Sequence, residues 1–431
     1  MRTGQLLALL GVSLILASAS YTLGKFNARD TISRPEVSWA LGSSAAIKIS
    51  DLSISLEHAA NAIRERNPEA SENELGKAYD YLSELLAASV EMHIAKGNTT
   101  APEFTDWMSG YRKFLGDSPD AIYSTAPVDA SLEYEIEIMA GSADYFGLVV
   151  YERNPITGWN RVADSTSIIP ETKHALLRIP VSSKSRSGND AAPINSTDHR
   201  LDMSAVDINA STTSLNLASR PNQDLSLTLS DRSHMIMVRE YFFDSETRQP
   251  SKLAIRPLTI NSHRDTVEVD AIPFEARAEN AVNFFNETWQ GSLALADALK
   301  ETANSFDRPS TVSPDFVGIF YPTPDNDYHG GAFSLQPGEA LIIEGEVPTA
   351  AFWSITLQNH WMQSIQNRGK SASLTGSQIT NRQGTYRVWI SDTAPPAGED
   401  WLDTGGEPEG LVAIRYLLAD NASAPRAKLY R

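Results

Sequence analysis

Apolar and polar residues alternate along this chain in short runs, and one series of runs occurs twice. An alternating run at 132–138 is followed by an aromatic-led apolar run at 145–150 and then by an apolar run at 237–242. Strand-like runs follow in the same order at 341–345, 352–357 and 413–418, and the second of them is again aromatic-led. A period of two is typical of half-buried β-strands, and short continuous apolar runs fit buried strands. The pattern therefore predicts two β-units of similar construction.

Two further features mark the repeat. The motif P-D-x-x-Y stands before the first run of each series, at 119–123 and at 324–328. The last run of each series carries an arginine near its centre, Arg239 in one and Arg415 in the other. Four elements in the same order favour a duplicated β-domain over a chance match of three letters.

Helical periodicity occurs in two stretches. Ser71 and Glu74 form a capping box, in which each side chain can satisfy a free backbone N–H group of the other residue at a helix start. Apolar residues then recur at helical spacing at Leu75, Tyr79, Leu82, Leu86 and Val90. The second stretch carries Val282, Phe285, Trp289, Leu293, Ala296 and Leu299 on one face. We expect it to cover a sheet edge or to join the two halves.

These elements predict a mainly β protein of tandem antiparallel jelly-roll or β-sandwich units, with an N-terminal helical segment and an intervening helix. A length of 431 residues allows more than one core. We expect a signal peptide at 1–20, a linker at 21–51, a helical segment at 52–117, a first β-unit at 118–272, a connecting helix at 273–315, a second β-unit at 316–418 and a tail at 419–431.

The C-terminal part of the sequence resembles a known bacterial family. The resemblance lies in the D-N-D-Y string at 325–328, the P-T-A-A-F-W-S-I-T-L string at 348–357, Trp401-Leu402 and Ile414-Arg415-Tyr416. It points to an uncharacterised exported family known as domain of unknown function twelve-fourteen. The resemblance implies tandem jelly rolls and export, and it implies no agreed activity. The chain departs from the family pattern at Gln358-Asn359 and at 400–403, so no ligand role is carried over to those positions.

The composition restricts the partners and the compartment. A formal charge of −18 disfavours nucleic acid and anionic membranes, because both require a basic surface. Arg2, the apolar stretch 6–17 and Ala17-Ser18-Ala19 fit a cleavable export signal, with an uncleaved membrane anchor as the alternative. The chain has no cysteine, so its stability depends on its core without disulfides. We expect a periplasmic or secreted bacterial protein with no further membrane insertion.

The usual strings of catalytic sites are absent from the sequence. It has no G-x-S-x-G, H-E-x-x-H, Walker A or G-x-G-x-x-G motif, and without cysteine it has no thiolate nucleophile or thiolate metal site. No cofactor is predicted.

The densest polar group is Asp325, Asp327 and His329, since alternate residues of a strand share a face. Glu344, Glu346 and His360 are possible additions to a metal or acid–base site. The alternative is that Asp325 caps the turn and that the other two side chains face solvent.

The two arginines raise a separate question, because a buried guanidinium needs partners. The duplicated carboxylates Asp120 and Asp325 are the predicted partners, so we expect Asp120 near Arg239 and Asp325 near Arg415. A structural clamp and ligand recognition both remain open for these arginines.

Tryptophans concentrate late in the chain, at Trp353, Trp361, Trp389 and Trp401. Aromatic faces among amides suit stacking on sugar rings, and core packing is the alternative. Trp361 and Trp401 have the more polar neighbours. We therefore predict that any ligand-binding pocket lies in the second unit, walled by Asp327, His329, Trp361 and Trp401.

Two functions follow from this reasoning. The first is a non-catalytic module that binds a glycan-like or other small ligand, or that assembles with itself. The second is a metal-assisted hydrolase or lyase that uses Asp327 and His329.

Overall fold

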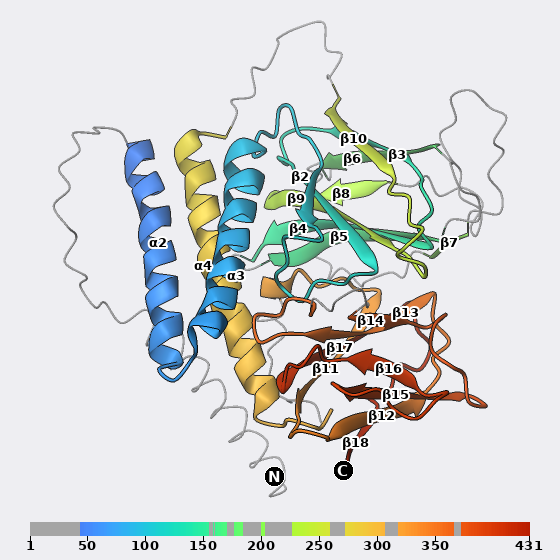
Figure 1. Cartoon of the computed structure of the whole chain (residues 1–431). Coiled ribbons are helices and arrows are strands. Elements are labelled where there is room, and N and C mark those ends of the chain that lie inside the picture. The colour runs from blue at the N-terminus through green and yellow to red at the C-terminus, as the bar shows by residue number, and fades with distance from the viewer. Residues whose placement is uncertain are drawn as a thin grey trace, which may run out of the picture.

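The computed structural model of the chain describes residues 44–154, 158, 160–169, 176–183, 200–202, 226–258, 272–306, 318–365 and 372–431. Figure 1 shows a mainly β architecture with helices along one side and two β-units stacked on each other. The predicted fold class is therefore confirmed. The predicted signal peptide and most of the predicted linker lie outside the described residues.

The first β-unit is a sandwich of two sheets. One sheet has the order β1-β2-β9-β4-β5-β7 and the other β10-β3-β6-β8. Their bounds are β1 Thr105–Met108, β2 Ala121–Pro127, β3 Tyr134–Met139, β4 Tyr145–Arg153, β5 Asn160–Ile169, β6 Leu176–Ser183, β7 Arg200–Asp202, β8 Leu227–Leu229, β9 Ser233–Tyr241 and β10 Lys252–Pro257. Its interior is an apolar cluster that includes Ile136, Leu148, Ile179 and Val238, all fully shielded from solvent.

The second β-unit has the same design. Its sheets have the orders β11-β17-β13-β14 and β16-β15-β12-β18. The bounds are β11 Asn326–Ser334, β12 Ala340–Glu346, β13 Phe352–Gln358, β14 Ser373–Thr375, β15 Thr385–Ser391, β16 Asp400–Asp403, β17 Glu409–Leu417 and β18 Arg426–Tyr430. A separate apolar core lies between these sheets and includes Leu341, Ile355, Val388 and Ile414.

Strand pairing shows that the duplication covers whole units. The order β2-β9-β4-β5 corresponds to β11-β17-β13-β14, and β10-β3-β6-β8 corresponds to β18-β12-β15-β16. Even the parallel pair β6–β8 has a parallel counterpart in β15–β16. The stretch expected to be a tail at 419–431 therefore holds β18, the counterpart of β10, which completes the second sandwich by pairing with β12.

Helices form a layer against both units. They are α2 (Ser44–Arg66), α3 (Glu72–Val90), the short π-helix η1 (Glu91–Ala95) and α4 (Phe274–Lys300), and a 3-10 turn η3 spans Gly318–Phe320. Helix α2 begins inside the expected linker, and strand β1 lies inside the expected helical segment. An apolar cluster joins this layer to both units, with Tyr81 from α3, Trp289 from α4, Tyr241 from the first unit and Phe352 from the second. No helix in the described part of the chain is long and apolar enough to cross a membrane.

The predicted capping box begins α3. The Ser71 hydroxyl accepts a hydrogen bond from the Glu74 backbone N–H at 3.3 Å, and the Glu74 carboxylate accepts one from the Ser71 N–H at 2.8 Å.

We expect Ser71→Ala to lower the free energy of unfolding by about 1 kcal/mol, because helix-start N–H groups lose their acceptor. Ser83→Ala is the control, since the Ser83 hydroxyl only bonds back to the Tyr79 carbonyl within the same helix and alanine is a better helix former. Denaturant unfolding monitored by circular dichroism compares the two variants. An equal loss in both would contradict the capping role.

Candidate functional site

The tyrosine of each P-D-x-x-Y motif lies beside the duplicated arginine of its own unit. In the first unit, Tyr123 on β2 is the register partner of Arg239 on β9. In the second, Tyr328 on β11 is the register partner of Arg415 on β17. Side chains alternate between the faces of a strand. The neighbouring Val238 and Ile414 fill the sandwich interiors, so both Tyr–Arg pairs lie on the outer faces of their sheets.

These two outer faces meet each other. Figure 1 shows the sheet that contains β11, β17, β13 and β14 on the side of the second unit that is turned toward the first. The Tyr241 and Phe352 rings, one from each unit, have centroids 5.1 Å apart. We call this contact the seam and define it by Tyr123, Tyr145, Arg239, Tyr241, Tyr328, Phe352, Ser354 and Arg415.

Electrostatics confirm that both arginines act on the same tyrosines. Burial raises the pKa of Tyr123 to about 12, and Arg415 and Arg239 both oppose that rise. The pKa values of Tyr241 and Tyr328 are also raised by burial and opposed by both cations. The seam is thus a desolvated space in which two guanidinium groups share three phenol neighbours.

Each arginine reaches across the seam to a backbone carbonyl of the other half. Arg239 donates from Nη2 to the Tyr321 carbonyl at 2.6 Å and to the Tyr151 hydroxyl at 2.9 Å. Arg415 donates from Nη2 to the Gly116 carbonyl and from Nη1 to the Thr356 hydroxyl, the latter at 3.1 Å.

The two carbonyls occupy equivalent places in the repeat. Gly116 and Tyr321 each stand three residues before the proline of their P-D-x-x-Y motif. Both have a left-handed backbone, with φ of +74° and +50°, which is uncommon for a residue other than glycine. The contact is therefore reciprocal, and we call it the arginine clasp.

The predicted Asp–Arg partners are wrong. Among the described residues no ion pair joins Asp120 to Arg239 or Asp325 to Arg415, because each aspartate precedes its strand while the guanidinium points outward from the middle of another. The backbone carbonyls of the two aspartates accept backbone hydrogen bonds instead. The Asp120 carbonyl accepts from the Phe242 N–H at 2.9 Å, and the Asp325 carbonyl accepts from the Leu418 N–H at 2.8 Å.

The aspartate side chains lie apart from the expected arginines. Burial raises the pKa of Asp120, and a hydrogen bond from Ser373 and the charge of Arg415 oppose the rise. Burial raises the pKa of Asp325 to about 6, and the Thr323 hydroxyl donates to its carboxylate.

Several polar atoms in the seam have no hydrogen-bond partner among the described residues. They include Arg239 Nη1, Tyr145 Oη and Ser354 Oγ, from residues that are 3%, 1% and 0% exposed. The Tyr145 hydroxyl lies over Gly147, where an added Cβ would be 3.3 Å away, and Gly147 is the register partner of Arg239. Ser354 is likewise the register partner of Arg415.

Tyr328 is the exposed member of the seam. Tyr328 keeps 47% of its surface exposed, although desolvation raises the pKa of its hydroxyl. The accessible part of the ring and the desolvated hydroxyl therefore lie at different depths. Tyr328 is therefore the seam residue that is in contact with solvent.

The four residues predicted to wall a ligand pocket do not come together. Asp327 is exposed, and His329 is 7% exposed and packs on Tyr416 at 5.6 Å. Both project from the face of β11 opposite to Tyr328, because they are the register partners of Tyr416 and Ile414.

The two tryptophans lie elsewhere. Trp361 is 8% exposed and stacks on Tyr81 of α3 at 5.9 Å. Trp401 lies on the outer face of the far sheet, packed near Trp389, and donates to the Ser391 carbonyl at 3.1 Å. The tryptophans thus sit on opposite sides of the second unit.

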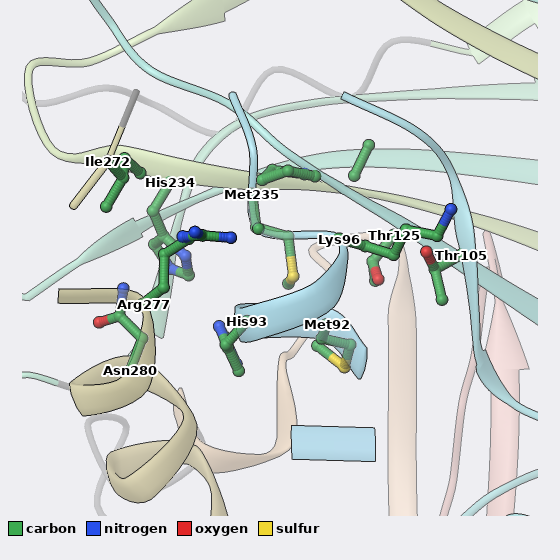
Figure 2. Close-up of a pocket in the computed structure, with 13 residues that line it drawn as sticks. Met92, His93, Lys96, Thr105, Thr125, His234, Met235, Ile272, Arg277 and Asn280 are labelled. Carbon is green, nitrogen blue, oxygen red and sulfur yellow. The ribbon is translucent and has the colours of Figure 1, made fainter. Parts of the chain in front are cut away.

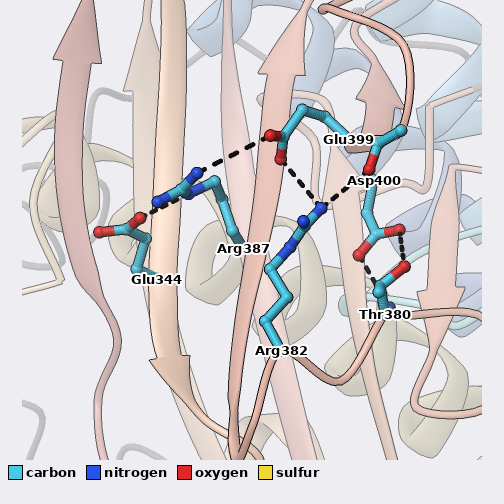
Figure 3. A network of polar contacts seen from close by, with 7 residues as sticks. Glu344, Thr380, Arg382, Arg387, Glu399 and Asp400 are labelled. Carbon is cyan, nitrogen blue, oxygen red and sulfur yellow. Dashed lines mark hydrogen bonds and ion pairs between the residues drawn. The ribbon is translucent and has the colours of Figure 1, made fainter.

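The predicted additions to a metal site are also dispersed. Glu344 belongs to a polar network on the outer surface of the second unit, shown in Figure 3, in which Arg387 bridges Glu344 at 2.6 Å and Glu399 at 3.7 Å. His360 lies 3.8 Å from Asp297 of α4. The described part of the chain contains no group of three or more acidic or histidine side chains placed to hold a metal ion.

A second candidate is a cavity of about 60 Å³ beneath η1, drawn in Figure 2. His93, His234, Thr105 and Arg277 line it. Burial, with Arg153 nearby, lowers the pKa of His93 to about 3 and that of His234 well below its usual value. Both imidazoles are therefore neutral near pH 7. The volume suits a few water molecules. His93 Nε2, Thr105 Oγ1 and Arg277 Nε, from three of the lining residues, also have no hydrogen-bond partner among the described residues.

Comparison with known proteins agrees with the fold. Residues 318–420 match the model of a family described as a protein of unknown function, DUF1214, which confirms the resemblance in the second unit. A crystal structure of an uncharacterised protein from Burkholderia cenocepacia superposes with a TM-score of 0.69 at 21% identity, covering 89% of this chain and 96% of that one. A crystal structure of a protein from Vibrio parahaemolyticus covers 82% of this chain and 98% of that one at 10% identity, with a TM-score of 0.43. No curated protein matches the chain.

Proposed function

We propose that this chain is a non-catalytic binding protein that holds a small molecule in the seam between its two β-units. The observation that carries the proposal is the set of buried, unpartnered polar atoms, Arg239 Nη1, Tyr145 Oη and Ser354 Oγ. A buried polar group without a partner costs about 1–3 kcal/mol, and native proteins contain few of them. A ligand that supplies the missing partners accounts for their retention.

The comparison of the two halves supports this assignment. Both units keep the arginine of the clasp and the tyrosine that is its register partner. The register partners of the arginines differ, since Gly147 stands in one unit where Ser354 stands in the other. Likewise Tyr145 begins β4, whereas Phe352 begins β13. The unpaired groups Tyr145 and Ser354 are therefore features that the repeat itself does not require.

We expect Tyr145→Phe and Ser354→Ala each to stabilise the ligand-free protein by about 1 kcal/mol, because each change removes an unsatisfied buried group at nearly constant shape. A gain of this size raises the Tm by roughly 2–4 °C if a unit of about 150–250 residues unfolds on its own, and by about 1 °C if the whole chain unfolds as one. Differential scanning calorimetry of the dialysed protein measures it.

Thr356→Val is the matched control. The Thr356 hydroxyl contacts both Arg415 and Ser373, at 3.1 and 3.0 Å, so its loss should destabilise the protein. A loss of stability in Tyr145→Phe comparable to that in Thr356→Val would show that the Tyr145 hydroxyl is satisfied without a ligand, and the proposal would fail.

We further propose that binding takes place in the bacterial envelope or outside the cell. The support is the export signal predicted at 1–20, including Arg2 and the apolar stretch 6–17. N-terminal sequencing of the native protein from the envelope fraction tests this. A chain that retains Met1 in a membrane pellet would show an anchor instead.

A further inference from the structure

We propose that the ligand of the seam is a monocarboxylate carried on an aromatic ring, with its carboxylate bound by Arg239 Nη1 and the Tyr145 hydroxyl. This inference rests on the proposed function, and it adds the chemical class of the ligand and its orientation. Three properties of the seam lead to it: the hydrogen-bonding capacity of the unpaired groups, the local charge and the nature of the walls.

The unpaired groups can all donate. A guanidinium N–H is only a donor, and the hydroxyl groups of Tyr145 and Ser354 can each donate one hydrogen bond. A group that only accepts is their natural complement, and an ionised carboxylate is such a group. Charge-assisted bonds from arginine to a carboxylate are stronger than neutral ones.

The local charge selects one arginine and a single negative charge. Arg415 already donates to three oxygen atoms, those of Thr356, Gly116 and Asp117. It also lies in the field of the carboxylates of Asp117 and Asp120. Arg239 donates to a hydroxyl and a carbonyl, both neutral, and its Nη1 has no partner among the described residues. One uncompensated cation therefore favours a monovalent anion over a divalent phosphate.

The walls of the seam are aromatic. The Arg239 guanidinium lies 6.0 Å from the centroid of the Tyr123 ring. The Tyr241 ring meets Tyr145 at 5.8 Å with an interplanar angle of 65° and meets Phe352 at 5.1 Å with an angle of 48°. Such tilted rings offer both faces and edges to a further flat ring. Tyr328, which is 47% exposed, is the member of the seam that reaches solvent.

The experiment uses the full mature chain and isothermal titration with benzoate as the probe. Benzamide has the same shape without the charge, cyclohexanecarboxylate keeps the charge without the aromatic ring, and glucuronate and inorganic phosphate represent other anions. We expect saturable benzoate binding, with benzamide and phosphate weaker by about ten-fold or more, because a charge-assisted bond is lost or an excess charge is buried.

Variants locate the site. Tyr145→Phe should weaken benzoate binding by about ten-fold, and Arg239→Lys should weaken it while keeping the charge. Tyr111→Phe is the control, since Tyr111 is 74% exposed and outside the seam, and it should bind as the parent does. Benzoate that binds Tyr145→Phe as tightly as the parent protein would overturn the inference.

The remaining outcomes separate the two proposals. Preference for glucuronate, phosphate or benzamide with the same dependence on Tyr145 would overturn the aromatic carboxylate and leave the seam as the binding site. The same holds if no probe binds but Tyr145→Phe still stabilises the dialysed protein. If no probe binds and Tyr145→Phe destabilises the protein, both proposals fail.

Discussion

Replacing Arg415 by methionine is expected to lower the free energy of unfolding by about 3–5 kcal/mol, as observed when one member of a buried charge network is removed. The Arg415 side chain is 3% exposed and holds the Gly116 and Asp117 carbonyls. Its charge also lowers the pKa of Asp117 and Asp120, against the effect of burial. Methionine fills the space but leaves two carbonyls without this donor and two carboxylates without this cation.

Arg239→Met is the matched control for that prediction. The Tyr321 carbonyl keeps a hydrogen bond from the Tyr151 hydroxyl at 2.8 Å when Arg239 is removed. The cost should therefore be no more than about 2 kcal/mol. Urea unfolding followed by both circular dichroism and tryptophan fluorescence compares the variants and tests whether the units unfold together. Equal losses, or a larger loss in Arg239→Met, would contradict the unequal roles assigned to the two arginines.

The sequence was sufficient to predict the architecture because binary patterning is local. Alternation in runs such as 132–138 and continuous apolar runs such as 352–357 depend only on which faces of a strand are buried. The boundaries were harder to predict where the pattern was weak. Strand β18 (Arg426–Tyr430) is exposed at alternate positions, so it looks like a polar tail until its pairing with β12 is known.

The candidate site was predictable only in part. The duplicated arginines were recognised, and so was their burial. The tyrosines of P-D-x-x-Y are a usable signal in the sequence, but opposite charges favour the neighbouring aspartates as predicted partners of the arginines. In the structure Tyr123 and Tyr328 pair with the arginines. The docking of one unit on the other brings Arg239 to Tyr321 and Arg415 to Gly116. The relative position of two folded units produces no periodic pattern in the sequence, so these contacts could not be predicted from it.

The predicted pocket residues were dispersed for a related reason. Their prediction rests on residue type and on polar neighbours in the sequence, and neither states which face of a strand a residue occupies. Register then separates them, since Asp327 and His329 alternate with Tyr328 on β11. Comparison of the two units at the register partners of the arginines identifies Ser354 in place of Gly147.

We expect Asp325→Asn to stabilise the protein at pH 7.5 and to have no effect near pH 3.5. The pKa of Asp325 rises from 3.8 to about 6 because of burial. Between these values the folded protein binds a proton that the unfolded chain does not, so stability falls as the pH rises through this range. Above pH 6 the native state contains a partly buried charge, at a cost of about 3 kcal/mol for a shift of this size.

The neutral amide of Asp325→Asn avoids this cost, and its oxygen can still accept the hydrogen bond that the Thr323 hydroxyl donates to the carboxylate. Its advantage over the parent protein should therefore grow from zero to about 2–3 kcal/mol between pH 3.5 and 7.5. Asp327→Asn, two residues along the chain and exposed, should show no such growth. Chemical denaturation at a series of pH values measures both curves. If the advantage of Asp325→Asn is constant across this range, Asp325 ionises as freely in the folded protein as in the unfolded chain. That result would contradict the raised pKa of Asp325.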